Sequence, residues 1–377
     1  MIRRRGENFH SLIRSHAVPI TLLQCINCAA CSNFAPETFH RGTIDAAHVV
    51  YHQPESVSDI DKARAALAAC PVAAIRVETL AEKRHRATDK EAVTESWSDG
   101  DQALVQKMSI AENKPFPRPF LEDHNAVPGV YWTGHHNEAS FGATPYLTRA
   151  VVDGKPVWIM VDTPKYSRSA INAVELLTGS SGPDYLFLTH VDDTADHGKY
   201  AEHYPSMQRI FHEGDLGRHN WIGDTTLADV ETLLSNVDVD SKASSGLVAY
   251  QMDGTPVPLE QWLAASDDAD TNVIILHTPG HSPGSLSLYK RPDASNPTGV
   301  LFTGDTYGWT TRDGGRMTAF SKYGNNLGQQ SETLKSLVKL PWQVIAPGHG
   351  HPRDYRGEDD SVRREEMENA LEEITSS

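Results

Sequence analysis

The stretch Tyr185–His197, YLFLTHVDDTADH, joins a short apolar run to a loop dense in metal-binding side chains. The loop supplies two histidines and three aspartates: His190, Asp192, Asp193, Asp196 and His197. An apolar strand that ends in such a loop can hold these side chains in a fixed geometry, which a metal site requires. The stretch alone leaves two interpretations open, a metal site at the edge of a β-sheet or an acidic surface loop, and the rest of the chain has to decide between them.

Three later stretches place metal-type side chains after an apolar run in the same way. VIILHTPGHSPGSLSLY carries His277 and His281, GVLFTGDTY carries Asp305, and WQVIAPGHGHP carries His349 and His351. The spacings are 23 residues between His281 and Asp305 and 43 residues between Asp305 and His349. Each motif is weak when taken alone, but four of them in this order together predict one metal centre.

The order His…Asp-His, then G-H-x-P-G-S, T-G-D and P-G-H-G resembles the metallo-β-lactamase superfamily, over about residues 127–355. The resemblance implies an αββα sandwich with one or two metal ions at one sheet edge. It further implies that His281 binds the first metal, Asp305 bridges, and His349 binds the second. Asp196 and His197 match the closing Asp-His of the first motif. They would serve the second metal, with Asp196 also orienting a reacting water as the catalytic residue.

The first motif departs from the family pattern T-H-x-H-x-D-H. Asp192 stands where the second His is expected, and the closing Asp-His arrives two positions late. Because alternate residues of an extended segment face the same side, we expect His190 and Asp192 to point together, with Asp193 and Thr194 bulging outward. In an alternative register, Asp192 replaces the first His, and His190 only supports the ligands.

The exchange of His for Asp bears on the identity of the metal. Added carboxylate favours harder ions such as iron, although zinc also accepts Asp. The flavodiiron proteins of the same superfamily carry H-x-E-x-D-H and hold two irons, so Asp192 resembles their pattern. We therefore expect one or two metal ions, zinc or iron, held by His190, Asp192, Asp196, His197, His281, Asp305 and His349.

The cysteines form a second metal-type pattern. Cys25, Cys28 and Cys31 lie in CINCAAC, and Cys70 is followed by Pro71. C-x2-C-x2-C with a remote Cys-Pro is typical of iron–sulfur proteins, whereas a zinc knuckle or unrelated buried cysteines are the alternatives. The flanking DKARAALAACPVAAIRVE predicts a helix that runs into Cys70 and then a short strand, AIRVE. With this stretch, residues 17–80 resemble a single-cluster bacterial ferredoxin. The resemblance implies one [4Fe–4S] cluster on these four cysteines.

The predicted fold class is α+β with two domains. We expect a ferredoxin-like [4Fe–4S] domain over residues 1–82, a linker over 83–125 that includes KPFPRPF, and a metallo-β-lactamase-like domain over 126–377. A length of 377 residues suits two domains.

Charge and composition narrow the partners. The net charge of −16 disfavours nucleic acid, and without a run of 18 apolar residues we expect no membrane span. Clustered cysteines indicate a reducing compartment, which we take as the cytoplasm. The alternative is the plastid stroma, because similar chains occur in plants, algae and cyanobacteria.

Three functions fit these features. The leading hypothesis is a metal-dependent hydrolase of the ester or thioester type, whose iron–sulfur domain serves electron transfer or regulation. The alternative is a non-haem iron oxidoreductase that receives electrons from the ferredoxin domain. The third is a non-catalytic redox or scaffold module. A small-molecule substrate and a redox partner protein are the expected partners.

Overall fold

The N-terminal part of the chain is a small unit of two helices and a two-stranded sheet. The structure is a computed structural model that describes residues 25–42, 47–75, 77, 115–237, 246–265 and 270–375. The elements of this unit are α1 (Ala30–Phe34), β1 (Phe39–Arg41), β2 (His48–Val50) and α2 (Val57–Ala69), with β1 antiparallel to β2.

Helix α2 confirms the helix predicted to run into Cys70. It begins at a capping box, in which the Ser56 side chain accepts from the Asp59 amide and the Asp59 carboxylate accepts from the Ser56 amide. The helix ends at Ala69, so its last turn presents Cys70 beside the cysteine loop. Part of the strand predicted over AIRVE lies outside the described residues.

The rest of the chain is built on two seven-stranded sheets. In order across the first sheet, the strands are β3 (Arg118–Pro119), β4 (Val130–Trp132), β5 (Tyr146–Val152), β6 (Lys155–Val161), β7 (Tyr185–Phe187), β8 (Gln208–His212) and β9 (Thr232–Leu234). Strands β6 to β9 run parallel, and the other pairs are antiparallel.

The second sheet is antiparallel except for one parallel pair, β14 with β17. In order across it, the strands are β11 (Pro256–Val257), β10 (Val248–Tyr250), β12 (Val273–His277), β13 (Leu286–Lys290), β14 (Val300–Gly304), β17 (Val344–Pro347) and β18 (Arg353–Asp354). A separate hairpin pairs β15 (Gly308–Thr310) with β16 (Arg316–Thr318).

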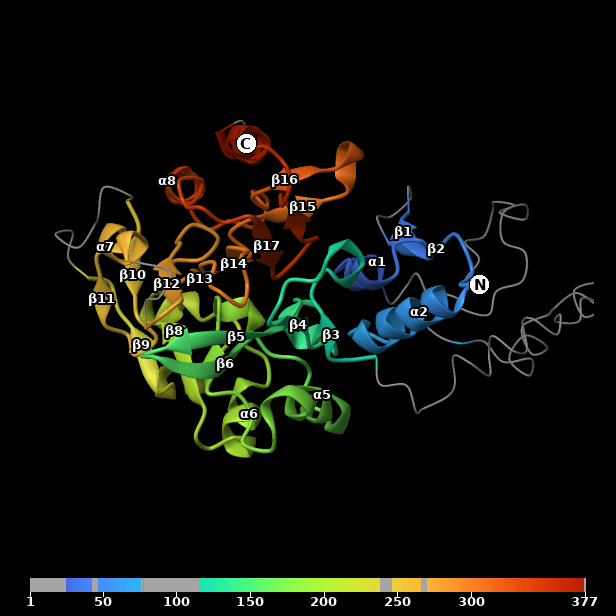
Figure 1. Cartoon of the computed structure of the whole chain (residues 1–377), viewed down its shortest axis with the longest axis horizontal. Helices are drawn as coiled ribbons and strands as arrows, with labels where there is room; N and C mark the ends of the chain where they lie inside the picture. The colour runs from blue at the N-terminus through green and yellow to red at the C-terminus, as the bar shows by residue number, and fades with distance from the viewer. Residues whose placement is uncertain are drawn as a thin grey trace, which may run out of the picture.

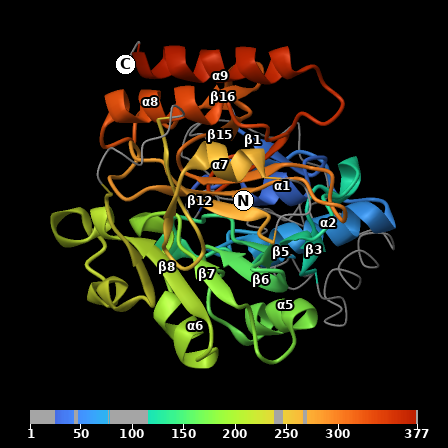
Figure 2. The same cartoon turned by 60° about the vertical axis from the view of Figure 1, so that its left-hand side comes forward.

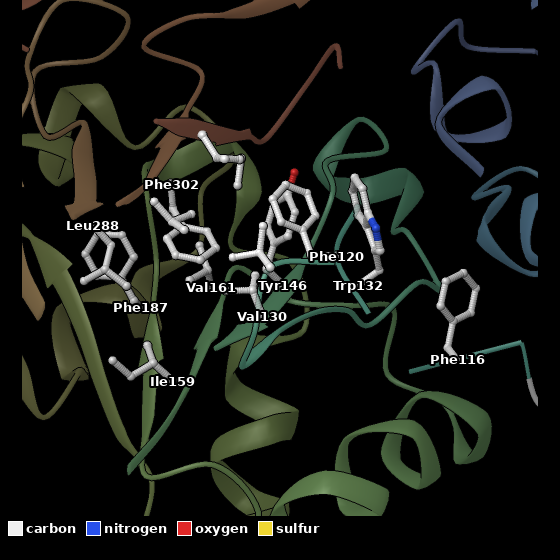
Figure 3. Packing of buried hydrophobic residues seen from close by; sticks show 14 of the residues in the cluster. Phe116, Phe120, Val130, Trp132, Tyr146, Ile159, Val161, Phe187, Leu288 and Phe302 are labelled. Carbon is white, nitrogen blue, oxygen red and sulfur yellow. The ribbon is translucent and has the colours of Figure 1, made fainter. Parts of the chain in front are cut away.

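The two sheets face each other across the main core, and helices cover their outer faces (Figures 1 and 2). Because side chains alternate along a strand, Ile159 and Val161 of β6 point into the shared core while Met160 points outward. In the core, the ring of Tyr146 meets that of Phe302 from the opposite sheet at 5.5 Å (Figure 3).

The outer helices complete four layers. On the first sheet lie α5 (Arg168–Thr178) and α6 (His197–His203), and on the second lie α7 (Leu259–Ala264), α8 (Leu327–Leu337) and α9 (Asp360–Thr375). This arrangement confirms the predicted αββα sandwich. No helix in the described ranges is long and apolar enough to cross a membrane.

The N-terminal unit is packed into the same hydrophobic core as the sandwich. The Phe34 ring meets Phe116 at 5.1 Å and Trp132 at 5.2 Å, edge to face. Ion pairs frame this contact, between Arg118 and Asp61 at 2.6 Å and between Lys62 and Asp123 at 2.9 Å.

Part of the predicted linker, residues 115–125, belongs structurally to the sandwich. It supplies the edge strand β3 and two aromatic anchors, Phe116 and Phe120. Residues 78–114 lie outside the described part of the chain, so the domain boundaries at 82 and 126 stay a prediction.

Candidate metal centre

At least one metal-type side chain from each of the four motifs lies where strands of both sheets end. His190 follows β7, His281 follows β12, Asp305 follows β14 and His349 follows β17. Two backbone hydrogen bonds hold these loops together: the Leu286 amide donates to the Thr189 carbonyl at 2.8 Å, and the Gly348 amide to the Gly304 carbonyl at 2.9 Å. The sheet edges thus bring loops from distant parts of the sequence to one place.

Two overlapping groups could each hold a metal ion: His190, Asp192 and His281, and His190, Asp193 and Asp305. Within each group the ligand atoms lie within 4.8 Å of one another. Together with His349 they form what we call the metal centre: His190, Asp192, Asp193, His281, Asp305 and His349.

The spacing of the donor atoms suits a shared cation. Asp192 Oδ2 lies 3.6 Å from Nε2 of both His190 and His281. Asp305 Oδ2 lies 3.9 Å from Nε2 of His190 and 3.8 Å from Nε2 of His281. These separations are too long for hydrogen bonds. They approach the roughly 3.4 Å that separates two ligands of one tetrahedral ion with bonds of about 2.1 Å.

Buried polar atoms without partners give the same indication. Both carboxylate oxygens of Asp193 and the Nε2 atom of His190 lack a hydrogen-bond partner within the part of the chain that the structure describes. Asp193 is fully buried and lies 3.8 Å from His190 Nδ1, and a buried carboxylate without hydrogen bonds is costly unless a cation compensates it. The residues of the metal centre therefore fit one or two metal ions.

The electrostatics show how strongly these groups interact. Burial disfavours the imidazolium of His190, but the carboxylates of Asp193, Asp192 and Asp305 outweigh it and raise its pKa well above the usual value. The pKa of His349 is raised in the same way. Burial alone would lower it, but the carboxylates of Asp305 and Asp193 raise it to about 10. A divalent ion would take over the role of these protons.

Asp305 and His349 are joined directly. The ring Nδ1 of His349 lies 2.8 Å and 3.0 Å from the two oxygens of Asp305. Burial alone would raise the pKa of Asp305, but His349, His190 and His281 hold it well below its usual range. The side chains of Asp192, Asp305 and His349 retain 17%, 11% and 17% exposure, so the centre opens to solvent on this side.

The first loop differs from the prediction in which aspartate faces the centre. Val191–Asp193 forms a 3-10 turn (η4) rather than an extended segment, and this turn brings Asp193 inward as well as Asp192. The expectation that Asp193 bulges outward is therefore wrong. His190 lies within the centre, so the register that leaves it as mere support is not the one adopted.

Asp196 and His197 do not join the metal centre, which corrects their prediction as ligands and that of Asp196 as the catalytic residue. Asp196 precedes α6 and accepts hydrogen bonds from Asn137, from the Tyr166 amide and from Lys199. The physical reason is the 3-10 turn, which uses up the extra loop length before the Asp-His pair and moves that pair to the start of α6.

His197 begins helix α6 and is held by other groups. Its Nε2 lies 3.1 Å from Asp224 Oδ2 and 3.1 Å from Thr226 Oγ1, and its Nδ1 lies 3.3 Å from Arg209. Burial lowers the pKa of His197. Its contacts therefore support the fold of this outer layer rather than a metal ion.

Two buried aspartates support the ligands. Asp162, at the end of β6, accepts from the Thr189 amide at 2.8 Å and from its hydroxyl at 3.0 Å, and that hydroxyl lies 3.0 Å from His190 Nδ1. Burial raises the pKa of Asp162 to about 7.

Asp215, in η5 (Glu213–Asp215), accepts from the Val191 amide at 3.0 Å, from Ser282 Oγ at 2.7 Å and from the Gly284 amide at 2.6 Å. Asp215 did not emerge from the sequence. The signal that could have found it is the same as for the other motifs, since GD follows the apolar strand β8 within two residues of its end.

The four cysteines form a second site, the cysteine site, which consists of Cys25, Cys28, Cys31 and Cys70. All four thiols are free and line one cavity together with His48 and Ile75. Burial, with the neighbouring thiols, raises the pKa of Cys28 to about 12 and that of Cys31 well above its usual value. Such thiols ionise when cluster iron provides the positive charge, so these residues fit an iron–sulfur cluster.

Comparison with protein families assigns this site. Residues 20–77 match the family described as the 4Fe-4S single cluster domain of Ferredoxin I. A comparison with curated protein sequences gave no match. The match covers the part of the chain that carries the cysteines. The chain thus joins a ferredoxin-like [4Fe–4S] domain to an αββα sandwich that carries a candidate metal centre.

Comparison with solved structures found several similar chains. The metallo-β-lactamase GOB-18 from Elizabethkingia meningoseptica is 15% identical, with 69% of this chain and 90% of that chain covered and a TM-score of 0.38. A metallo-β-lactamase family protein from Thermus thermophilus is 18% identical, covering 66% and 78%, with a TM-score of 0.38. A structure described as the peroxy diiron species of the chemotaxis sensor ODP is 16% identical, covering 67% and 93%, with a TM-score of 0.39.

Proposed function

We propose that this chain is a non-haem iron oxidoreductase whose metal centre exchanges electrons with a [4Fe–4S] cluster on the cysteine site. The observation that carries the proposal is the shared hydrophobic core. Phe34, three residues after Cys31, packs between Phe116 and Trp132 of the sandwich. The two sites are thereby fixed relative to each other. When bound, the cluster would supply single electrons, and an iron ion at the metal centre would accept them.

The ligand set supports iron at the metal centre. His190, Asp192 and His281 form a group of two histidines and one carboxylate, the donor set of non-haem Fe(II) enzymes. Asp193 and Asp305 add two more carboxylates, and no thiolate takes part. Three carboxylates carry more negative charge than one divalent ion neutralises, which favours a ferric ion or a pair of divalent ions.

The protein groups around the centre hold and orient the ligands. Asp162, through Thr189, and Asp215, through Val191, fix the segment on either side of His190. The exposed sides of Asp192, Asp305 and His349 leave room for a small-molecule substrate to approach. We include this substrate and a protein that reduces the cysteine site in the proposal, and we place the chain in a reducing compartment such as the cytoplasm.

Hydrolysis is the second candidate, and one observation favours it. Two histidines and a carboxylate with an open side are also the ligands of catalytic zinc sites. In that function the zinc ion would lower the pKa of a bound water for attack on an ester or thioester. The cysteine site would then be an accessory, because hydrolysis consumes no electrons.

Metal analysis of the anaerobically purified chain separates the two candidates. The oxidoreductase predicts about four irons and four sulfides for the cluster, plus one or two further irons. It also predicts reductant-dependent chemistry that is lost on Cys70→Ala and on His281→Ala. Zinc at the metal centre, with ester turnover lost on His281→Ala but kept on Cys70→Ala, would instead establish the hydrolase and refute the proposal.

A further inference from the structure

We propose that the Phe141–Gly142 peptide is the contact through which electrons pass between the cysteine site and the metal centre, and that His349 is the ligand at which they arrive. This inference rests on the proposed function. It concerns a segment that none of the sequence motifs includes, directly after η3 (Glu138–Ser140).

On one side, the backbone of this peptide lies against the cysteine site. A Cβ placed on Gly142 would stand 2.6 Å from Cys28 Cβ, 3.0 Å from Cys28 Sγ and 3.3 Å from Pro71 Cγ. Pro71 directly follows Cys70, so Gly142 touches both cysteine-bearing segments. Its φ of +83° and this close approach together require glycine here.

On the other side, the same peptide accepts a hydrogen bond from His349, a residue of the metal centre. The Nε2 of His349 donates to the Phe141 carbonyl at 3.3 Å, while its Nδ1 faces Asp305 at 2.8 Å. A metal-binding histidine commonly donates its second ring N–H to a backbone carbonyl, which fixes the ring and tunes the ligand. The Phe141 carbonyl is therefore the outer partner of His349.

Further hydrogen bonds hold the peptide in place. The ring Nδ1 of His136, a buried residue, donates to the Gly142 carbonyl at 2.9 Å. The Thr144 amide donates to the Gly348 carbonyl at 2.7 Å, next to His349. Because both of its ends are fixed, the peptide forms a rigid contact between the two sites.

A second contact between the two parts of the chain reaches the same loop. The Asn33 side chain donates to the Gly350 carbonyl at 3.0 Å and also hydrogen-bonds the ring of His351. Asn33 lies two residues after Cys31, and Gly350 directly follows His349. The ferredoxin-like domain therefore docks around His349. Among the residues that the structure describes, we assign the route to the Phe141–Gly142 peptide, because it touches a cysteine side chain on one side and the His349 ring on the other.

The transfer itself is a one-electron step. The cysteine site would hold the cluster that supplies the electron, and His349 and Asp305 would hold the iron ion that accepts it; the cluster would be oxidised by one electron as ferric iron is reduced to ferrous, with no covalent bond formed or broken. An external reductant, dithionite in the experiment below, supplies the electron to the cluster.

The test compares Gly142→Ala with Gly179→Ala. Gly179 also has a positive φ, +76°, but no heavy atom lies within 4 Å of an added Cβ, so both substitutions place a side chain on backbone that favours glycine and only the first pushes against Cys28. Each full-length variant, with its iron and sulfide content verified, receives one electron per chain from dithionite under anaerobic conditions. Rapid-freeze EPR then follows the decay of the reduced-cluster signal.

We expect wild type and Gly179→Ala to pass the electron to the metal centre at the same rate, and Gly142→Ala to be slower by at least about tenfold, as for loss of an outer partner of a ligand. An equally fast Gly142→Ala with both sites loaded would overturn the route and leave the proposed function standing. If the cluster of wild-type protein is reduced but the metal centre never takes the electron, the proposed function itself fails.

His136→Phe gives the answer if Gly142→Ala does not retain its cluster. This change removes the hydrogen bond to the Gly142 carbonyl without adding an atom next to Cys28. Slower transfer in His136→Phe supports the route, and an unchanged rate overturns it. Asn33→Ala, which loses the second contact, should transfer electrons at the wild-type rate.

Discussion

Asp215→Asn tests whether one buried carboxylate sets the spacing of two candidate ligands. Asp215 is fully buried between the loops of His190 and His281. Its Oδ2 accepts from the Val191 amide at 3.0 Å and from Ser282 Oγ at 2.7 Å, and its Oδ1 accepts from the Gly284 amide at 2.6 Å. Asparagine has nearly the same shape, but its NH2 group must face a donor where an oxygen accepted before.

The expected magnitude follows from these bonds. A hydrogen bond to a charged group contributes about 1.5–3 kcal/mol, so we expect the free energy of unfolding to fall by about 2–3 kcal/mol. The larger consequence concerns metal binding. Val191 and Ser282 directly follow His190 and His281, so a shift of either loop changes the distance between the two rings. Loss of such an outer partner should weaken metal binding by about 10–100-fold.

The assay is a titration of the metal-free centre with Co(II), followed by the visible absorption of the bound ion. Asp293→Asn is the matched control, because Asp293 accepts from Lys290 at 2.9 Å and from Asn272 at 2.6 Å near the other end of β13. Asp293→Asn should lose stability but keep the Co(II) affinity and spectrum of wild type. The reasoning is refuted if Asp215→Asn binds Co(II) as wild type does, or if both variants weaken binding equally.

Four further substitutions test the ligand assignment and the docking of the domains. Asp193→Asn should lower the metal retained per chain after dialysis, whereas Asp196→Asn should retain as much as wild type. The opposite ranking would restore the motif-based assignment. Trp221 donates to Asp192, so metal binding should change tryptophan fluorescence in wild type and much less in Trp221→Phe; an equal change in both would contradict this contact. Phe34→Ala should cost about 3–5 kcal/mol in denaturant unfolding, and a loss below about 1 kcal/mol would mean that the aromatic contact does not hold the domains together.

The sequence was sufficient for features that depend on a single strand and its loop. A strand ending at Gly304 must deliver Asp305 to the sheet edge, and the same holds for His349 after β17. The C-x2-C-x2-C spacing likewise brings three thiols together through one short loop. These inferences needed only the local direction of the chain, and most side chains that lie together at the candidate metal centre are ones that the motifs named, while their role as ligands stays a prediction.

The errors arose where several loops have to fit together. Whether Asp193 or Asp196 faces the centre depends on a 3-10 turn over Val191–Asp193, which the carboxylate of Asp215 holds from another loop through the Val191 amide. No periodicity in the sequence encodes that contact. The docking of Cys28 on Gly142 is equally invisible, because more than a hundred residues separate them and only the folded sheets bring them together.

Because Asp193 lies in the centre, it forms the second group of candidate ligands together with His190 and Asp305. A Cβ on Gly348 would stand 2.9 Å from Asp193 Oδ2 and 3.0 Å from Asp305 Oδ1, so the glycine of P-G-H-G makes room for two carboxylates side by side, the buried Asp193 and the partly buried Asp305. Two such charges repel each other unless a cation lies between them. A loop that is longer by two residues has thus not abolished the second position. In the proposed function, the single carboxylate of Asp193 takes the place of the predicted Asp-His pair, and the loss of an imidazole makes the donor set harder, which supports the proposal of iron.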